Sequence, residues 1–347
     1  MIKSRSQHHV IDTIQLFLIL FLIGSTTSLS SCRQSPQAHS TDDEVMIPVP
    51  GSELYVRVRG DGGGPLLINL HGGPGGYSGI DIQLMGPALE DQFLVAYLDQ
   101  RGCGKSLACK DTTMLTVEQY IVDLDIVIHS LMQLYNKRSV SLAGTSWGGM
   151  YGFLYMLEYP DKVASYACID GKVNSHYQNH SLIDYEMRRA KEIADTTTSA
   201  SKRDEMTFII SELKRIKNSN FENFHTDVNW MKHEVPAMLG FNAYFVDTSK
   251  VISFRDVIED TSLLNLMRYT REEYEQIAEK AELVNAVFRN TPSYNNINIE
   301  DALTGLDAQQ KELHIIPGVA HCPAIESPGK LSEILISFFG KHALFNR

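Results

Sequence analysis

The stretch that decides the fold is Ser139-Val140-Ser141-Leu142-Ala143-Gly144-Thr145-Ser146-Trp147-Gly148, an apolar run that leads into the pattern Gly-x-Ser-x-Gly. Residues 139–143 predict a strand, and the residues after 148 predict a helix. A serine at a sharp turn between a strand and a helix exposes its hydroxyl, and flanking glycines let neighbouring backbone approach. Free N–H groups at the start of the helix favour a developing negative charge. We therefore predict that Ser146 is a nucleophile, although a turn rich in glycine and serine is common on its own.

Short apolar runs alternate with an amphipathic stretch on both sides of this turn. Residues 66–70 and 93–98 are almost continuously apolar, which is typical of strands buried on both faces of a parallel sheet. Residues 117–135 place apolar side chains at helical spacing. Further elements are predicted as a leading hairpin at 46–58, strands at 164–169 and 313–316, and a last helix at about 329–344. This succession predicts a doubly wound α/β sheet with its ligand site at the carboxyl ends of the strands.

The region after Asp170 differs from the preceding part in composition and in predicted secondary structure. From about residue 171 to residue 290 the chain is charged and helical in pattern, and no clear strand interrupts it. We predict that this region is a helical cap inserted into the sheet domain. The sheet domain is thus expected to comprise residues 44–170 and 300–347, with the cap at 171–299.

The first residues have the features of an export signal. Lys3 and Arg5 precede an apolar run at 14–23, which is shorter than the roughly 20 residues that span a bilayer. Leu29-Ser30-Ser31-Cys32 resembles the lipobox of bacterial lipoproteins, in which the cysteine takes the lipid. We predict a signal peptide at 1–31, lipidation at Cys32, and a polar tether at 32–43. The protein would then be exported and held at a bacterial membrane by its lipid alone; the alternative is an ordinary signal peptide with a chance cysteine.

The overall composition excludes some classes of function. The chain has 347 residues, 43% of them hydrophobic, and a formal net charge of −11. An acidic chain without a long basic run argues against a nucleic-acid partner. No Cys-x-x-Cys pair or histidine cluster has zinc spacing, so we expect no metal and no other cofactor. Cys103 and Cys109 are close enough in sequence to form a disulfide in an oxidising compartment, but the sequence leaves the pairing open.

A glycine-rich loop follows the predicted strand at 66–70. It reads His71-Gly72-Gly73-Pro74-Gly75-Gly76, which lacks the spacing of a nucleotide-binding loop. A hydrolase needs a second backbone donor facing the acyl oxygen, and a loop without side chains beside the nucleophile supplies it. We predict that the N–H groups of Gly73 and Trp147 form the oxyanion hole. The plainer alternative is a turn with no further role.

His321 follows the predicted strand at 313–316. A lone histidine is more often a surface or core residue, but this position and the chain order Ser then His fit a general base. His71 is the competitor, although it precedes the nucleophile and belongs to the glycine-rich loop. The motif Asp99-Gln100-Arg101-Gly102-Cys103-Gly104-Lys105-Ser106 is expected to brace the loops around the site, with Arg101 paired to Asp99 or to the turn.

Four motifs together carry a resemblance. HGGPGG, DQRGCGKS, GTSWGG and GVAH, in this order and spacing, closely resemble the proline iminopeptidase family of serine peptidases. The resemblance implies the α/β-hydrolase fold and removal of N-terminal residues, often proline, through an acyl-enzyme. It also implies carboxylates that hold the free amine of the substrate. Glu186 and Glu234 in the cap are candidates, although each is expected to be an exposed helix residue.

The chain departs from that family before His321. The family has a further strand there, whose loop delivers the acid of the triad, but residues 295–307 offer neither an apolar strand nor a Gly-x-x-Asp turn. Asp301 lies only 20 residues before His321, so we slightly favour Asp170 as the acid, with Asp301 as the alternative. The substrate is expected to be a small peptide or an ester. An esterase, and a catalytically impaired hydrolase-fold binding protein, remain the competing hypotheses.

Overall fold

The structure, a computed structural model, describes residues 40–106, 111–220, 245–250, 254–284 and 311–343, together with 287, 290, 291 and 298. The chain divides into two units, Met1–His39 and Ser40–Arg347. All described residues belong to the second unit, so the predicted signal peptide and Cys32 lie outside them. The last four residues of the predicted tether, 40–43, belong to the first strand.

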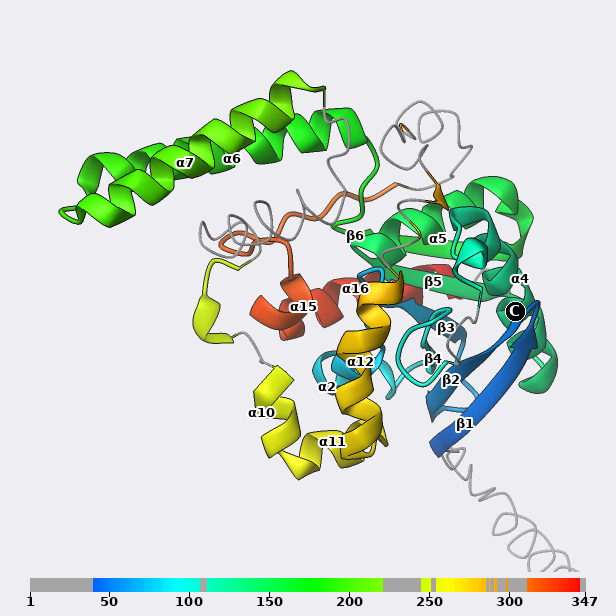
Figure 1. Ribbon diagram of the computed structural model, residues 1–347. Helices are drawn as coiled ribbons and strands as arrows, with labels where there is room; N and C mark the ends of the chain where they lie inside the picture. Colours follow the sequence, from blue (N-terminus) through cyan, green and yellow to red (C-terminus); the bar gives the residue numbers. More distant parts are fainter. Residues whose placement is uncertain are drawn as a thin grey trace, which may run out of the picture. The chain divides into compact units, whose positions relative to one another are not determined.

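The centre of the second unit is a six-stranded sheet of order β1-β2-β4-β3-β5-β6 (Figure 1). Its strands are β1 Ser40–Val49, β2 Ser52–Asp61, β3 Leu66–Leu70, β4 Leu94–Leu98, β5 Val140–Thr145 and β6 Val163–Ile169. The pairs β1–β2 and β2–β4 are antiparallel, whereas β3–β4, β3–β5 and β5–β6 are parallel. The predicted hairpin and the predicted mostly parallel sheet are confirmed, and the architecture is the α/β-hydrolase fold.

Helices cover both faces of the sheet because its central strands are apolar on both sides. Every residue of β3 and β4 is buried. One core cluster joins strand residues to Leu124, Ile128 and Leu131 of α4 (Val117–Leu134). The other joins Leu67 and Val95 to α16 (Pro328–Ala343). Thr116 fixes the start of α4, since its side chain accepts a hydrogen bond of 3.2 Å from the backbone N–H of Gln119.

The strand predicted at 313–316 is not formed. These residues have no regular secondary structure, and Leu313 and Ile315 are 86% and 81% exposed. Only Ile316 packs against a core cluster. A short apolar run does not distinguish a buried strand from an extended connection by its periodicity, which is why the prediction was wrong. Among the described residues β6 is therefore the last strand of the sheet, in line with the expected loss of a late strand.

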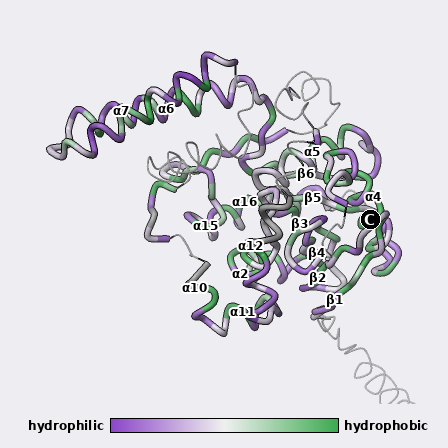
Figure 2. Tube along the Cα trace, viewed as in Figure 1, coloured by the Kyte–Doolittle hydropathy of each residue, from purple (hydrophilic) through white to green (hydrophobic). Residues whose placement is uncertain are grey.

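The described part of the predicted cap is helical. It contains α6 Ser175–Thr196, α7 Ala200–Asn218, α10 Phe254–Glu259, α11 Thr261–Met267 and α12 Arg271–Val284. Helices α6 and α7 pack on each other through Ile183, Leu213 and Ile216, and both are largely hydrophilic in Figure 2. Of the helices that the structure describes, none combines the length and the apolar character needed to cross a bilayer.

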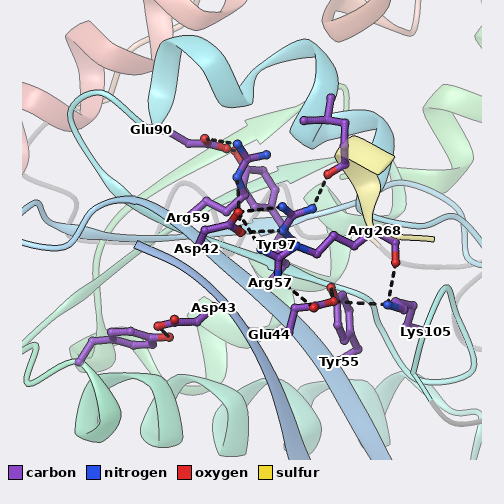
Figure 3. Close-up of polar contacts among 12 residues, drawn as sticks. Asp42, Asp43, Glu44, Tyr55, Arg57, Arg59, Glu90, Tyr97, Lys105 and Arg268 are labelled. Atoms are coloured by element: carbon purple, nitrogen blue, oxygen red, sulfur yellow. Dashed lines mark hydrogen bonds and ion pairs between the residues drawn. The ribbon is translucent and has the colours of Figure 1, made fainter. Parts of the chain in front are cut away.

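A polar cluster attaches the end of α11 to the first strand and to the loop after β4 (Figure 3). Arg268, which ends α11 in a left-handed conformation, donates to Glu44 at 2.9 Å and to Asp42 at 3.0 Å. The ammonium of Lys105 donates to the carbonyl of Arg268 at 2.8 Å. Arg57 of β2 donates to the carbonyl of Leu266. The end of α11 is thus held against the sheet domain by charged side chains.

Candidate active site

Ser146 occupies the sharp turn between β5 and α5 (Trp147–Glu158) that the sequence predicts. Its backbone is strained, with φ 53° and ψ −114°. Its N–H donates to the carbonyl of Ile169 at the end of β6, at 2.8 Å. The flanking glycines are required by space, because a Cβ on Gly148 would lie 2.1 Å from the carbonyl oxygen of Leu70, and one on Gly144 would lie 2.3 Å from that of Gly148.

The predicted base lies beside the predicted nucleophile. His321 Nε2 is 2.9 Å from Ser146 Oγ, although the two residues are 175 positions apart in the chain. Burial lowers the pKa of His321 from its ordinary value. The imidazole is therefore neutral at neutral pH, and its Nε2 can accept the proton of the serine hydroxyl.

The glycine-rich loop passes directly beside the nucleophile. A Cβ on Gly72 would lie 3.5 Å from the Cβ of Ser146, so this part of the loop contacts the serine closely. Gly73 has a φ of 139°, a conformation that side chains rarely allow. Trp147 begins α5 and follows Ser146 directly. The backbone groups proposed for the oxyanion hole thus belong to two segments next to Ser146: the glycine-rich loop near its Cβ, and the start of α5.

His71, the competing base, is engaged elsewhere. Its Nε2 accepts from the N–H of Gln100 at 3.2 Å, which leaves Nδ1 to donate to the carbonyl of Gly72 at 2.7 Å. The side chain of Gln100 donates to the carbonyl of His71 at 2.8 Å and accepts from Trp147 Nε1 at 2.7 Å. His71 therefore fixes the glycine-rich loop relative to α5, and is not placed to act as the base.

Asp99 is a fully buried carboxylate that joins three segments. Its Oδ1 accepts from both the N–H and the hydroxyl of Ser78, each at 2.8 Å. Its Oδ2 accepts from the N–H of Lys105 at 2.8 Å and from the hydroxyl of Tyr269 at 2.5 Å. These contacts match the predicted bracing role of the motif. Asp99 links the loop after β3, its own loop, and the segment between α11 and α12.

Of the two predicted partners of Arg101, Asp99 is wrong, but Nη2 of Arg101 does donate to the carbonyl of Pro50, in the turn between β1 and β2, at 2.8 Å. Arg101 is also fully buried, and its Nε and Nη2 donate to the two carboxylate oxygens of Asp123 in α4 at 2.6 and 2.7 Å. The oxygens of Asp99 already accept from Ser78, Lys105 and Tyr269. A two-point contact between a guanidinium and a carboxylate is geometrically matched, so Arg101 fixes its loop to α4.

The acid of the triad stays a prediction. Asp170 directly follows β6 and has a φ of 49°, and burial raises its pKa. The hydrogen bonds among the described residues do not join Asp170 to His321. Asp301 lies outside the described residues. The disulfide between Cys103 and Cys109 also stays a prediction, because Cys109 lies outside them as well.

Glu186 is not the exposed residue that the sequence predicts. It lies on the buried stripe of α6 and has no exposed surface. Among the described residues, neither of its carboxylate oxygens has a hydrogen-bond partner. Burial raises the pKa of Glu186 to about 8. Glu234, the other candidate, lies outside the described residues.

Sequence reasoning missed Glu326, which follows His321 by five positions. Its carboxylate accepts from the N–H of Ala320, the residue before the histidine, at 2.7 Å. A signal was available, since an acidic residue in Cys322-Pro323-Ala324-Ile325-Glu326-Ser327-Pro328 stands among apolar neighbours directly after the predicted base. Buried carboxylates in such a setting are usually hydrogen-bonded.

Similar proteins are hydrolases and peptidases. Residues 65–214 match the family described as alpha/beta hydrolase fold. A proline iminopeptidase of Lactobacillus helveticus (strain DPC 4571) is 31% identical over 187 residues, which cover 52% of this chain and 60% of that relative. The chain therefore aligns with less than two thirds of that relative's length.

Two solved structures share the fold at low identity. The proline iminopeptidase of Mycobacterium smegmatis has a TM-score of 0.56 and is 17% identical, with 88% of this chain and 100% of that chain covered. A membrane phospholipase A, described as a bacterial virulence factor, has a TM-score of 0.54 and is 17% identical, with 95% and 98% covered. At this identity the likeness establishes the fold alone.

Proposed function

We propose that this protein is a serine hydrolase that removes N-terminal residues from short peptides. The observation that carries the proposal is the 2.9 Å contact between Ser146 Oγ and His321 Nε2 at a strained turn between a strand and a helix. A serine hydroxyl becomes a nucleophile when an adjacent base accepts its proton. The match to the hydrolase family and the similarity to a proline iminopeptidase support the same class of reaction.

The reaction would proceed through an acyl-enzyme. Ser146 Oγ attacks the scissile carbonyl while His321 Nε2 accepts its proton, and the N–H groups of Gly73 and Trp147 stabilise the resulting oxyanion. His321 then returns the proton to the leaving amine. A water molecule, activated by the same imidazole, releases the acyl group and regenerates Ser146. Asp170 or Asp301 would orient the imidazole.

The preference for a free N-terminus would come from the cap. The proposed partners of the substrate amine are the carboxylates Glu186 and Glu234. Glu186 supports this role because a buried carboxyl group without hydrogen bonds is suited to a cationic partner.

The test compares three reporters on the full-length protein in detergent: a prolyl amide with a free amine, its N-acetylated counterpart, and a short acyl ester. We expect the free-amine amide to be cleaved far faster than the acetylated one, and Ser146→Ala to abolish the cleavage. Cleavage of the ester without either amide would contradict the peptidase and favour the esterase. A folded protein that cleaves none of the three would favour the impaired binding protein.

The proposed location rests on the lipobox at Cys32. We propose that the protein is exported and anchored to a bacterial membrane through a lipid on this cysteine. Replacing it, in Cys32→Ala, should release the protein from the membrane fraction. A variant that still sediments with membranes would contradict the lipid anchor.

A further inference from the structure

A buried carboxylate is hydrogen-bonded to the residue before the histidine. Glu326 ends α15 (Pro323–Glu326), the short helix that begins two residues after His321, and it is only 6% exposed. Its backbone N–H donates to the carbonyl of Cys322 at 3.0 Å, which fixes the turn directly after the histidine. Charged side chains are buried at such positions only where hydrogen bonds compensate for lost hydration.

Both oxygens of this carboxylate accept hydrogen bonds, and they face different segments. Oε2 accepts from the N–H of Ala320 at 2.7 Å. Oε1 accepts from the N–H of Val246 at 2.7 Å and from that of Asp247 at 2.9 Å. The ammonium of Lys250 donates to the backbone carbonyl of Glu326 at 2.8 Å. One side chain thus connects the loop of His321 with residues 245–250, which belong to the predicted cap.

The charge of Glu326 is matched to this environment. Burial acts to raise the pKa of Glu326, but the N–H groups of Asp247, Ala320 and Val246 and the ammonium of Lys250 outweigh it and hold the pKa below its ordinary value. The neighbouring thiol of Cys322 has its pKa raised by burial and by the charges of Glu326, Asp170 and Asp81. Glu326 is therefore ionised at neutral pH and beside a neutral thiol.

We propose that Glu326 is a positioning residue that holds His321 within reach of Ser146 and ties that position to cap residues 245–250. The inference rests on the proposed serine mechanism. It follows from the contact with Ala320, because a shift of that N–H moves the adjacent histidine. Movement of the cap would also affect the position of His321, because displacement of Val246 and Asp247 removes two of the hydrogen-bond donors that hold the Glu326 carboxylate.

The chemistry of the contact selects the test variants. In Glu326→Gln only one terminal atom still accepts hydrogen bonds, so either Ala320 or the pair at 246–247 loses its partner. Glu326→Asp keeps the charge but is one methylene too short to reach both segments. Lys250→Met removes a partner of Glu326 at its carbonyl without touching the carboxylate. The matched control is Glu333→Gln on α16, where the glutamate is exposed and paired with Lys330.

The experiment measures the rate of labelling by a fluorophosphonate from pH 5 to pH 9, together with thermal unfolding, on the full-length protein in detergent. Labelling requires neutral His321, so the wild-type rate should rise with pH through a midpoint below 6.5. Glu326→Gln and Glu326→Asp should label at least about ten-fold more slowly at pH 7. Their midpoints should shift up towards the ordinary histidine value, because a displaced imidazole is less buried. Lys250→Met should shift in the same direction by less, and Glu333→Gln should match the wild type.

The outcomes distinguish a positioning role of Glu326 from a purely structural one. The labelling is measured below the melting temperature of each variant. If Glu326→Gln or Lys250→Met is less stable but has the wild-type labelling rate and the wild-type pH midpoint, the positioning role is overturned. If Glu326→Gln does not fold, Lys250→Met decides by the same criterion. A wild type that does not label at all would contradict the proposed function itself, and this inference with it.

Discussion

Buried charged groups are treated differently in the sheet domain and in the cap. In the sheet domain, Asp99, Asp123 and Glu326 each accept two or more hydrogen bonds from residues of other segments. In the cap, the carboxyl group of Glu186 is equally buried, yet neither oxygen has a hydrogen-bond partner in the part of the chain that the structure describes. An unsatisfied buried polar group is costly, so the two regions are built for different purposes.

The difference suggests that the sheet domain organises the candidate site, whereas the cap binds the substrate. The hydrogen-bonded carboxylates fix three segments around the candidate site: Asp99 binds Ser78 after the glycine-rich loop, Asp123 binds Arg101, and Glu326 binds Ala320 next to His321. In the described part of the cap, Glu186 has a buried carboxyl group without a hydrogen bond, which is what the proposed role in substrate binding requires. Variants of the sheet domain should therefore change turnover or global stability. Variants of the cap should change substrate affinity or the pH dependence of stability.

The largest effect is expected at the base. His321→Gln removes the proton acceptor of Ser146 and should lower kcat/KM by about 10⁴-fold or more, with little change in stability. His314→Gln is the matched control, because His314 lies on the same segment and is exposed, and it should keep wild-type activity. Steady-state kinetics on the best reporter measure both. If kcat/KM falls equally in His321→Gln and His314→Gln, His321 has no special role as the base.

The next effect is expected at the buried ion pair of the sheet domain. Arg101→Met leaves the carboxylate of Asp123 buried without its guanidinium and should lower the free energy of unfolding by about 3–5 kcal/mol. Arg189→Met, which breaks an exposed pair with Glu192 on α6, should cost less than about 1 kcal/mol. Urea denaturation checks both values. Equal losses would show that the sheet domain gains nothing special from its satisfied charges.

Glu186 sharpens the comparison through pH. Because the folded state holds its proton up to a pKa of about 8, against an ordinary 4.5, the folded protein binds more protons than the unfolded chain in this range. Stability should therefore fall as the pH rises from about 4.5 to 8, by up to about 3 kcal/mol at pH 7.

Glu186→Gln should remove that slope, whereas Glu205→Gln, an exposed residue of α7, should preserve it. Urea denaturation at several pH values checks this. If the carboxylate also binds the substrate amine, Glu186→Gln raises KM for the free-amine amide while kcat changes little. An unchanged slope in Glu186→Gln would mean that the group is not buried as described.

The smallest effect is expected at the charged cluster between α11 and β1. The side chains of Arg268 and of its partner Asp42 are 38% and 39% exposed, so water and salt screen their attraction. Arg268→Ala should lower the free energy of unfolding by about 1 kcal/mol or less. The loss should shrink further in 1 M salt. If Arg268→Ala lowers the free energy of unfolding as much as Arg101→Met does, this cluster contributes to stability like a buried ion pair, and the comparison fails.

The first half of the fold could be predicted because its signals are local. The runs at 66–70, 93–98 and 139–143 are mostly apolar and correspond to β3, β4 and β5. The turn at Ser146 has its glycines at fixed spacing, and the space around Gly148 explains why. The contact between Ser146 and His321 matches the predicted chain order of nucleophile and base, although the strand expected before His321 is not formed.

The second half depends on contacts that sequence spacing does not encode. Residues 313–316 resemble a strand but have exposed side chains, since burial is decided by neighbours from elsewhere in the chain. Arg101 pairs with Asp123 rather than Asp99 because Tyr269, 170 residues away from Asp99, already binds that carboxylate. The burial of Glu186 and the anchoring of Ala320 by Glu326 depend in the same way on the packing of helices and loops.

The most direct test of the central claim is covalent labelling of Ser146 by a fluorophosphonate, followed by peptide mapping, beside Ser146→Ala. We predict one phosphonyl group on the wild-type protein, located on Ser146, and none on the variant. Labelling of Ser146→Ala to the same extent, or no labelling of the folded wild-type protein, would contradict an activated serine nucleophile.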